Sequence, residues 1–489
     1  MRKVFFGCLW FFAIALISTD TCVPKAQARE GLTLLSNIIA QYNRSAIIRS
    51  LSDNTYRGEA GVLRMRPEVA RDFGLEAKMD ENYKRAAELT TQAEDTYREL
   101  LEGLKKKAPK GLKPHGVNKL LRLATSYHSK KTQATKLFLV YYKALESDQD
   151  ERLVDSVCLK LLRKELKRSL LRYHNKLRDS LADFFNRTYR GTEIDPPLAP
   201  SNVDFVNTVF QKFLEKAPSR VLRNYDLDAF LLKANSVRPE VWKMLFPPRL
   251  RSYGQIVERL YYKMGPGSYS VHPVLFMALM RRESNFDPTA ISDVGAVGLT
   301  QIMPGTAKLL GMNSVYLPPY FREAGELLRQ ARQWRAKALD LVEGIDGGDG
   351  RHKILKAWRY MQNAERLAAR SNKLFEKYEK DLLRDRSDDR FDVEKAISHG
   401  YKYFARMLRK YKGDISLALA AYNAGPSRVK KYGGIPPFPE TVTFRNAVLK
   451  YYEEYLDRLD IRPRSCLSKN RFWVPAGERD VPVAASFWP

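Results

Sequence analysis

A glutamate at the end of an apolar segment is the residue of this chain best suited to acid–base chemistry. Residues 274–280 are apolar on every side, and Pro273 suits the first turn of a helix. A helix that is hydrophobic all round is buried, yet this one ends in Arg281-Arg282-Glu283-Ser284. We therefore expect Glu283 at the carboxyl end of a buried helix, where burial and the helix dipole both disfavour its charged form. Both effects raise the pKa of the carboxyl group, as a general acid working near neutral pH requires.

A structural role explains the same pattern. A glutamate that follows an apolar helix can form an ion pair, and Arg281 or Arg282 would be its partner here. The segment alone leaves both the catalytic and the structural interpretation of Glu283 open.

Two later segments add polar side chains at points where the backbone turns. Residues 292–301 contain two glycines that permit tight turns or close backbone approach, and they end at Gln301, shortly before Met303 and a short helix. Asp414 is the expected cap of a helix over 415–422, which breaks at Asn423-Ala424-Gly425-Pro426. Tyr422 and Asn423 therefore lie at the end of a helix. Side chains at such a position often face a cleft, but a helix end with no functional role explains the same pattern.

These segments together resemble the soluble lytic transglycosylase family, which has a lysozyme-like catalytic domain. The resemblance lies in three ordered motifs, which here read Glu283-Ser284, Gly298-Leu299-Thr300-Gln301 and Ala421-Tyr422-Asn423-Ala424-Gly425-Pro426. The eighteen residues from Glu283 to Gln301 match the family spacing. The match covers about residues 254–312 and 390–455.

The resemblance implies a reaction and a set of roles. Glu283 would protonate the glycosidic oxygen between N-acetylmuramic acid and N-acetylglucosamine, then accept the proton of the muramic 6-hydroxyl as that oxygen attacks the anomeric carbon. The product would be a 1,6-anhydro sugar, which explains why one carboxylate is evident where ordinary glycosidases need two. Tyr422 would hydrogen-bond within the site and help to hold Glu283. The residues expected to line the sugar subsites are Ser284, Gln301, Met303, Tyr422 and Asn423. No cofactor and no metal ion is expected.

The sequence departs from the family pattern at three places. Relatives usually have Met at the position of Thr300, which predicts altered packing beside the sugar. Residues 439–444 keep Glu440 and Thr441 of a family segment but lack its Arg and Tyr, which weakens a site role for Glu440. A long insertion at 313–389 replaces a short connection, so strand access is expected to differ.

Two other functions remain open. A hydrolytic muramidase would need a second acid, such as Asp287 or Asp293, to hold a water molecule. A non-catalytic scaffold would bind cell wall through its basic helical region and would not depend on Glu283.

The elements that position these residues are expected to be helices throughout. Residues 29–250 predict an irregular helical N-terminal domain, with helices over 81–107, 118–145 and 151–187. We find no strand-like alternation and no repeat of fixed period. A helical solenoid is the alternative for this region.

A lysozyme-like transglycosylase domain is predicted over residues 251–462, followed by an irregular tail over 463–489. Its insertion is expected to form an antiparallel hairpin of two helices, over 322–342 and 353–384. The side chains that would pack the two helices together are Trp334, Trp358, Met361 and Leu374. The Asp-Gly cluster between them lacks the ligand spacing of an EF-hand and is interpreted as a turn.

The charge of the chain points to an anionic partner. The 489 residues carry a formal net charge of +28, with 44% hydrophobic and 29% charged residues. Basic runs at 105–107 and 163–168 are either solvated helix faces or a surface that holds an anionic wall or membrane. Charge alone does not choose among nucleic acid, a lipid surface and an acidic polymer. The resemblance implies peptidoglycan glycan strands as the partner, and no nucleic acid is expected because the first residues predict export.

The first residues predict export to the periplasm or cell envelope. Arg2 and Lys3 precede an apolar run over 4–17. Ala26-Gln27-Ala28 has small residues at the two positions that a signal peptidase recognises before its cleavage site. We expect a signal peptide over 1–28, with an uncleaved membrane anchor as the alternative. Beyond Ala28 the chain keeps Cys158 and Cys466, which either pair or remain two separate thiols.

Overall fold

The computed structural model describes residues 25–107, 114–227, 245–264, 269–345, 349–385 and 387–459. Within these ranges the chain consists of helices joined by turns, and the only β-pairings are isolated bridges. The predicted all-α fold is confirmed. None of the helices in these ranges is long and apolar enough to cross a membrane.

The described residues of the N-terminal half, 25–107 and 114–227, contain eight α-helices. They are α1 (Lys25–Ser52), α2 (Pro67–Asp72), α3 (Glu81–Lys107), α4 (Pro114–Lys143), α5 (Asp155–Arg172), α6 (Leu177–Phe185), α7 (Val203–Lys216) and α8 (Ser219–Leu222). The helix predicted over 81–107 is confirmed. The one predicted over 151–187 is wrong as a single helix, because His174 and Asn175 take left-handed backbone conformations (φ of 50° and 62°) that end α5.

The C-terminal half begins with α10 (Pro248–Met264). It continues with α11 (Pro273–Ser284), α12 (Pro304–Leu309), α13 (Pro319–Glu343), α14 (Gly350–Asp385), α15 (Val393–Lys410), α16 (Ile415–Ala424), α17 (Pro426–Lys431) and α18 (Pro439–Arg458). The expected hairpin is α13 and α14, which pack along their length. Met361 is fully buried in it, and the ring of Trp334 packs against Tyr360 at 4.8 Å.

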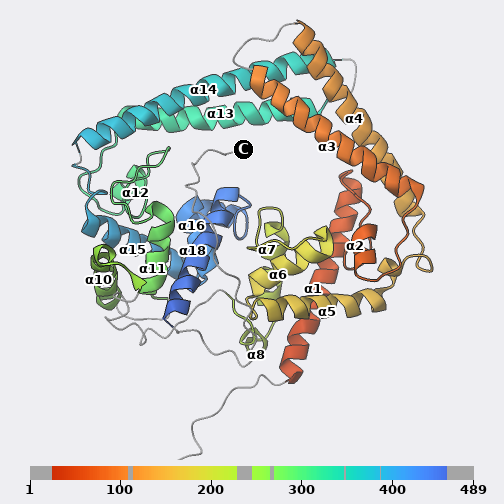
Figure 1. Cartoon of the computed structure of the whole chain (residues 1–489), viewed down its shortest axis with the longest axis horizontal. Coiled ribbons are helices and arrows are strands. Elements are labelled where there is room, and N and C mark those ends of the chain that lie inside the picture. The colour runs from red at the N-terminus through yellow and green to blue at the C-terminus, as the bar shows by residue number, and fades with distance from the viewer. Residues whose placement is uncertain are drawn as a thin grey trace, which may run out of the picture.

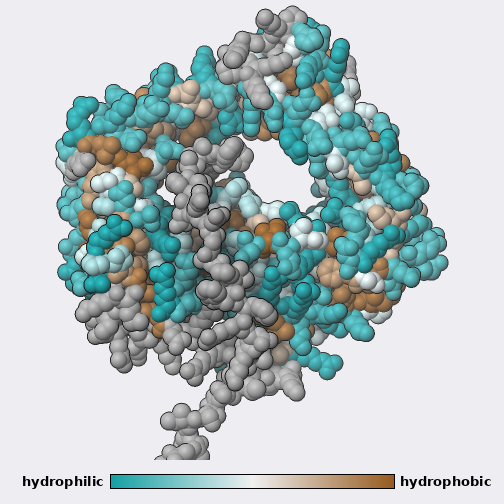
Figure 2. Space-filling model, in the orientation of Figure 1, coloured by the Kyte–Doolittle hydropathy of each residue, from teal (hydrophilic) through white to brown (hydrophobic). Residues whose placement is uncertain are grey.

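The helices are arranged as a closed ring around a central opening (Figure 1). The α13–α14 hairpin forms one side and the α3–α4 hairpin the next, and one apolar cluster joins the tips of the two hairpins. That cluster includes Leu104 and Leu120 from one hairpin and Val342 and Met361 from the other. The space-filling view shows the opening bordered mainly by hydrophilic residues (Figure 2).

The two halves also share their main core. A single cluster of buried apolar residues runs from α1, α5 and α7 to α11, α15, α16 and α18. Buried or half-buried ion pairs cross the same junction, among them Arg178 with Asp414 at 2.6 Å and Arg445 with Asp179 at 2.8 Å.

Several expectations concern residues at the ends of the chain. The leader up to Pro24, the tail over 463–489 and Cys466 lie outside the described residues, and the expected cleavage point after Ala28 falls within α1. Cys158 is a buried free thiol that hydrogen-bonds to the carbonyls of Glu151 and Arg152, and burial raises its pKa to about 12.

Candidate active site

Glu283 lies at the end of α11, as its sequence position predicts. The first eight residues of this helix are buried, so the helix is fixed on all sides. Asn285 ends it in the left-handed conformation (φ of 49°), and Glu283 is left only partly exposed. Burial raises the pKa of the Glu283 carboxyl to about 8. The charge of Glu440 also raises this pKa, whereas the charge of Arg282 lowers it. A carboxyl with this pKa is protonated at neutral pH and can donate a proton.

The interpretation of Glu283 as the partner of Arg281 is wrong. The Arg281 guanidinium pairs with Glu454 at 3.1 Å and lies 3.9 Å from the centre of the Tyr451 ring. No ion pair reaches the Glu283 carboxyl from any residue within the ranges described above. No ion pair from these residues therefore stabilises the charged form of the Glu283 carboxyl.

The turn that faces Glu283 is built around a glycine. Gly298 has a φ of 77°, and a Cβ atom there would lie 2.0 Å from the carbonyl oxygen of Arg390. Only glycine permits both the left-handed backbone and this close approach. The fully buried Arg390 in turn donates to the carbonyls of Gly295 and Ile302, which fixes the two ends of the turn.

Ser284 and Gln301 hold this turn in place. The Ser284 hydroxyl donates to the carbonyl of Leu299 at 3.0 Å, which ties the turn to the end of α11. Gln301 has a φ of 44°, and its amide nitrogen donates to the carbonyls of Ala290 and Gly298. Both residues lie beside the site, and the bonds that they make are to the protein backbone.

Thr300 points into the core and not into the cleft. Its side chain is fully buried, its hydroxyl donates to the carbonyl of Ala396 at 3.1 Å, and it lies directly against Gly400 on α15. The side chain of Thr300 therefore packs against α15, and its effect on packing beside a sugar stays a prediction.

Tyr422 is brought to the site by α16. Its hydroxyl donates to the carbonyl of Thr300 at 2.8 Å, and its ring stacks parallel to that of Phe444. Burial raises its pKa well above the ordinary value, and the nearby charge of Glu283 adds to the rise. Tyr422 and Glu283 are therefore neighbours as expected, although the hydrogen bond of Tyr422 goes to the turn and not to the carboxyl.

Asn423 and Met303 lie at two further edges of the site. The Asn423 side-chain oxygen accepts a hydrogen bond from the hydroxyl of Thr441 at 2.8 Å, which joins α16 to the start of α18. Met303 precedes α12 and has 37% of its surface exposed, which is high for a methionine. The roles of Ser284, Gln301, Met303, Tyr422 and Asn423 in binding sugar remain predictions.

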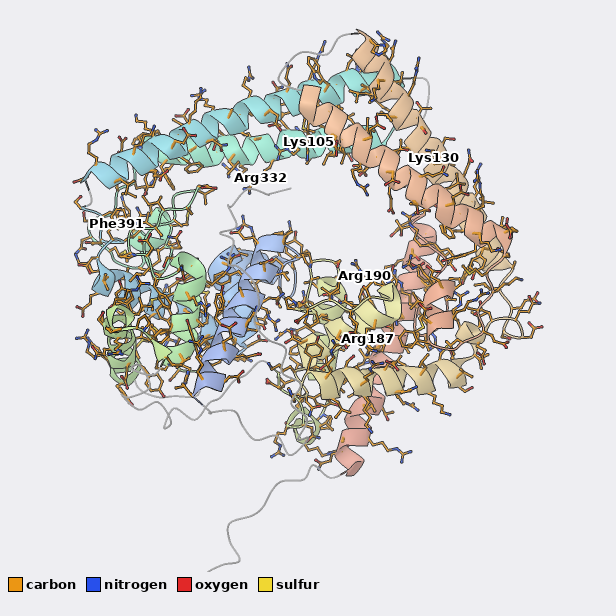
Figure 3. The ribbon with its side chains drawn as sticks, in the orientation of Figure 1. Lys105, Lys130, Arg187, Arg190, Arg332 and Phe391 are labelled. Carbon is orange, nitrogen blue, oxygen red and sulfur yellow. The ribbon has the colours of Figure 1, made fainter. Side chains whose placement is uncertain are left out.

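Two further charged residues lie at the site, Glu440, for which the sequence predicted a weakened role, and Arg332, which the sequence did not mark. Glu440, in the first turn of α18, is exposed and close enough to Glu283 to act on its pKa. Arg332, on α13, has its pKa lowered by burial and by the charge of Arg428, and the charge of Glu440 opposes that change. The insertion hairpin thus reaches the site, as the position of Arg332 beside the central opening also shows (Figure 3). No local pattern marks Arg332, because only the packing of the hairpin brings it there.

The acids named for a hydrolytic mechanism lie elsewhere. Asp287 accepts hydrogen bonds from the backbone and hydroxyl of Thr289, which caps its own turn, and Asp293 is exposed. Neither charge is among those that shift the pKa of Glu283. Across the described ranges no group of three or more His, Cys, Asp or Glu side chains could hold a metal ion.

The site residues lie in two segments that are similar to one known domain. The model of the transglycosylase SLT domain matches residues 261–323 and 361–441. A transglycosylase of Enterobacteria phage PRD1 is 44% identical over 50 residues, which are 10% of this chain and 19% of the phage protein. The chain thus spans about a fifth of the length of that relative.

A solved structure is also similar over much of the chain. It is that of an inactive mutant of the lytic transglycosylase Slt from Pseudomonas aeruginosa, with 14% identity, a TM-score of 0.25, and coverage of 78% of this chain and 68% of the other. Glu283, the turn at 298–301 and Tyr422 all fall within the two segments that the domain model matches, and the unmatched residues 324–360 lie in the α13–α14 hairpin. The two segments that flank residues 324–360 are therefore similar to the transglycosylase SLT domain.

Proposed function

We propose that this protein is a lytic transglycosylase that cleaves the β-1,4 bond between N-acetylmuramic acid and N-acetylglucosamine in peptidoglycan, with formation of 1,6-anhydro ends. The observation that carries the proposal is the pKa of about 8 for Glu283, set by burial beside Tyr422 within a transglycosylase SLT domain. The protein would act in the cell envelope and remodel the wall.

The reaction needs one group that gives and then accepts a proton. Protonated Glu283 donates to the glycosidic oxygen as the bond to the anomeric carbon breaks, which releases the N-acetylglucosamine hydroxyl and leaves a carboxylate. The acetamido group of the substrate stabilises the positive anomeric carbon. The muramic 6-hydroxyl then attacks that carbon and passes its proton to the carboxylate, so that Glu283 is restored and no water is consumed.

The charges around the site suit an acidic polymer. Arg428 lies close enough to Arg332 for its charge to lower the pKa of Arg332, and Arg428 also donates to the carbonyl of Ala424 at the end of α16. Peptidoglycan carries carboxylates on its peptide stems, which such a cationic pair would attract.

Digestion of purified peptidoglycan followed by mass analysis of the fragments tests the proposal. We expect anhydro ends, each lighter by one water than a reducing end, and no fragments with Glu283→Gln. Asp287→Asn, at an exposed turn, is the matched control and should cleave like the wild type. Reducing ends would show a muramidase instead, and normal lysis by Glu283→Gln would remove the catalytic assignment.

A further inference from the structure

Two buried arginines, one in each half of the chain, make the same set of bonds. The Arg152 guanidinium and backbone bind both oxygens of Asp150, its Nη2 donates to the Tyr141 hydroxyl, and its Nη1 donates to the carbonyls of Gly58 and Met65. Arg390 makes the corresponding bonds to Asp388, Tyr378, Gly295 and Ile302. The two side chains have 1% and 0% of their surface exposed. Six shared bonds at two buried sites are a strong sign of a common fold, since buried polar networks have strict geometry.

The turns that these arginines hold also match. Bridges pair Ala60 with Met65 and Val297 with Ile302. Gly61 and Gly298 both have positive φ. A Cβ atom on Gly61 would lie 1.7 Å from the carbonyl oxygen of Arg152, and one on Gly298 would lie 2.0 Å from the carbonyl oxygen of Arg390. Three residues later each turn has a non-glycine residue in the left-handed region, Arg64 (φ of 52°) and Gln301 (φ of 44°), which is uncommon.

The helices after each turn follow in the same order and at the same spacing. A six-residue helix that begins with proline comes first, as α2 and α12, and a long hairpin follows, as α3–α4 and α13–α14. Seventy-six residues separate Met65 from Tyr141, and seventy-six separate Ile302 from Tyr378. Next come α5 and α15, of 18 residues each, which begin three residues after their arginines.

The last helices of the two halves agree in their ends and their sequence. Tyr173 follows α5 as its C-cap and Tyr411 follows α15, with nearly equal dihedral angles. Both caps are followed by two left-handed residues and then by α6 or α16. α7 begins within Pro-Ser-Asn-Val-Asp-Phe-Val-Asn at 200–207, and α18 within Pro-Glu-Thr-Val-Thr-Phe-Arg-Asn at 439–446. Proline, valine, phenylalanine and asparagine recur at the same places.

The chemistry does not recur. α1 ends at Ser52 and α11 ends at Ser284. In both cases the backbone N–H of the next residue donates a hydrogen bond to the carbonyl of an arginine four residues earlier in the chain. Leu51 therefore occupies the position of Glu283. Counting from the start of α6 and α16 places Phe184, which is 1% exposed, at the position of Tyr422. The first half has neither the carboxyl nor the phenol.

The space that would form the first site is also filled. The Arg64 guanidinium lies 4.6 Å from the centre of the Tyr189 ring, and the Tyr189 hydroxyl donates to Glu59 at 2.8 Å. The Glu59 side chain is itself buried. Arg64 takes the place in the first turn that Gln301 takes in the second, and the bonded side chains of Tyr189 and Glu59 cover this turn.

We propose that residues 41–216 are a second, catalytically silent copy of the fold of residues 273–458, with its former sugar cleft closed by Arg64, Tyr189 and Glu59. The name "silent" rests on the proposed function of the other copy, but the equivalence of the two folds does not. The chain then holds one glycan site, and its N-terminal half serves as the partner that the active copy packs against.

The two copies meet as the subunits of a two-fold dimer do. Asn207 on α7 donates to the carbonyl of Ile435 at 2.9 Å, and its counterpart Asn446 on α18 donates to the carbonyl of Leu198 at 2.8 Å. The hairpin of each copy also packs against the hairpin of the other, in the cluster that closes the ring (Figure 1). Each of the two matched asparagines thus bonds to the segment that precedes the other's helix, and such reciprocal contacts are typical of an isologous interface, here within one chain.

Paired substitutions at the matching clusters test the equivalence. Tyr141→Phe and Tyr378→Phe each remove one bond to a buried arginine and should fold, and Arg152→Met and Arg390→Met are the stronger pair. We expect the two variants of each pair to raise amide hydrogen exchange in their own turn, 58–65 or 295–302, by similar factors. Only the variants at Tyr378 and Arg390 should lower kcat on peptidoglycan, by tenfold or more, because only their turn lies beside Glu283.

Unequal exchange in the two turns, or an equal loss of kcat in both pairs, would overturn the proposal. Titration of Glu283→Gln with chitin tetrasaccharide gives the number of sites directly, and we expect one per chain, whereas two would show that the first cleft is open. If the wild type does not cleave peptidoglycan, the proposed function fails, and the exchange data still decide whether the two folds are equivalent.

Discussion

The hydroxyl of Tyr422 donates a hydrogen bond of 2.8 Å to the backbone carbonyl of Thr300, which lies 122 residues earlier in the chain. This bond fixes the end of α16 against the turn at 298–301, and Glu283 lies beside both. The bond therefore joins two of the three segments that carry the motifs, and the hydroxyl of Ser284 ties the third to the same turn. The tyrosine can thus position the site through the turn and not through a bond to the carboxyl.

Tyr422→Phe should lower kcat more than it lowers stability. The change leaves the Thr300 carbonyl without its partner in a half-buried place, which costs about 1–3 kcal/mol in the free energy of unfolding. We expect kcat on peptidoglycan to fall by about tenfold to a hundredfold, because the turn and α16 lose their link beside Glu283. Urea unfolding and initial rates measure the two effects. Tyr262→Phe, on the exposed face of α10, is the control and should change neither.

Glu283→Gln should stabilise the protein at high pH. The pKa of Glu283 is raised to about 8 in the folded chain from an ordinary value of 4.5. Between these values the unfolded chain is ionised while the folded chain holds its proton, so the wild type loses stability as pH rises. The variant removes that loss, by about 2–4 kcal/mol above pH 8, at ~1.4 kcal/mol for each pKa unit with allowance for partial exposure.

Thermal unfolding of both proteins from pH 4 to pH 9 measures this difference. The two curves should coincide near pH 4 and separate as pH rises toward 8. Curves that stay parallel over the whole range would mean that the carboxyl of Glu283 has an ordinary pKa. Wild-type activity should fall above pH 8 over the same range, since the general acid loses its proton there.

Gly400→Ala should disturb the site through the core. An added Cβ atom would lie 2.6–2.8 Å from side-chain atoms of Thr300, which is short and cannot swing away. We expect a loss of about 1–3 kcal/mol in unfolding free energy, and a lower kcat because the carbonyl of Thr300 receives the Tyr422 bond. Gly305→Ala, where nothing lies within 4 Å, should be neutral or slightly stabilising. Equal effects of the two alanines would contradict the tight packing at Gly400.

Arg178→Met should weaken the junction between the two halves. Its guanidinium binds both oxygens of Asp414, at 3.0 and 2.6 Å, and the Arg178 side chain is 1% exposed. Removal of one partner from a buried pair costs about 3–5 kcal/mol. Asp414 also caps α16 through the backbone N–H of Leu417, so hydrogen exchange should rise at the start of that helix.

Arg44→Met is the matched control for that junction. Arg44 pairs with Asp155 where both side chains are 55% exposed, and exposed pairs contribute at most about 1 kcal/mol. If both variants lose the same small amount of unfolding free energy, the pair of Arg178 with Asp414 does not hold the halves together.

The sequence predicted those parts of the molecule that depend on local pattern. The apolar run over 274–280 predicted a buried helix with Glu283 at its end, and the structure confirms both the helix and the raised pKa. The charged pattern over 81–107 gave the bounds of α3, and the insertion was correctly expected to be a helical hairpin. Helices are local in their bonds, so their periodicity is visible along the chain.

What the sequence did not show depends on contacts between distant residues. The roles of Glu440 and Arg332 at the site, the burial of Thr300 and the joining of the two hairpins all arise from packing across the ring. The likeness of the two halves was missed because no repeat of fixed period exists: Gly58 matches Gly295 at a distance of 237 residues, but Arg152 matches Arg390 at 238. A buried arginine network tolerates such shifts in loops, since it constrains the positions of a few atoms and leaves the sequence between them free. The sequence by itself determined most of the helices and the motifs that resemble the transglycosylase family, because both are local patterns. The tertiary structure alone decided which side chains meet, because contacts between distant residues depend on packing.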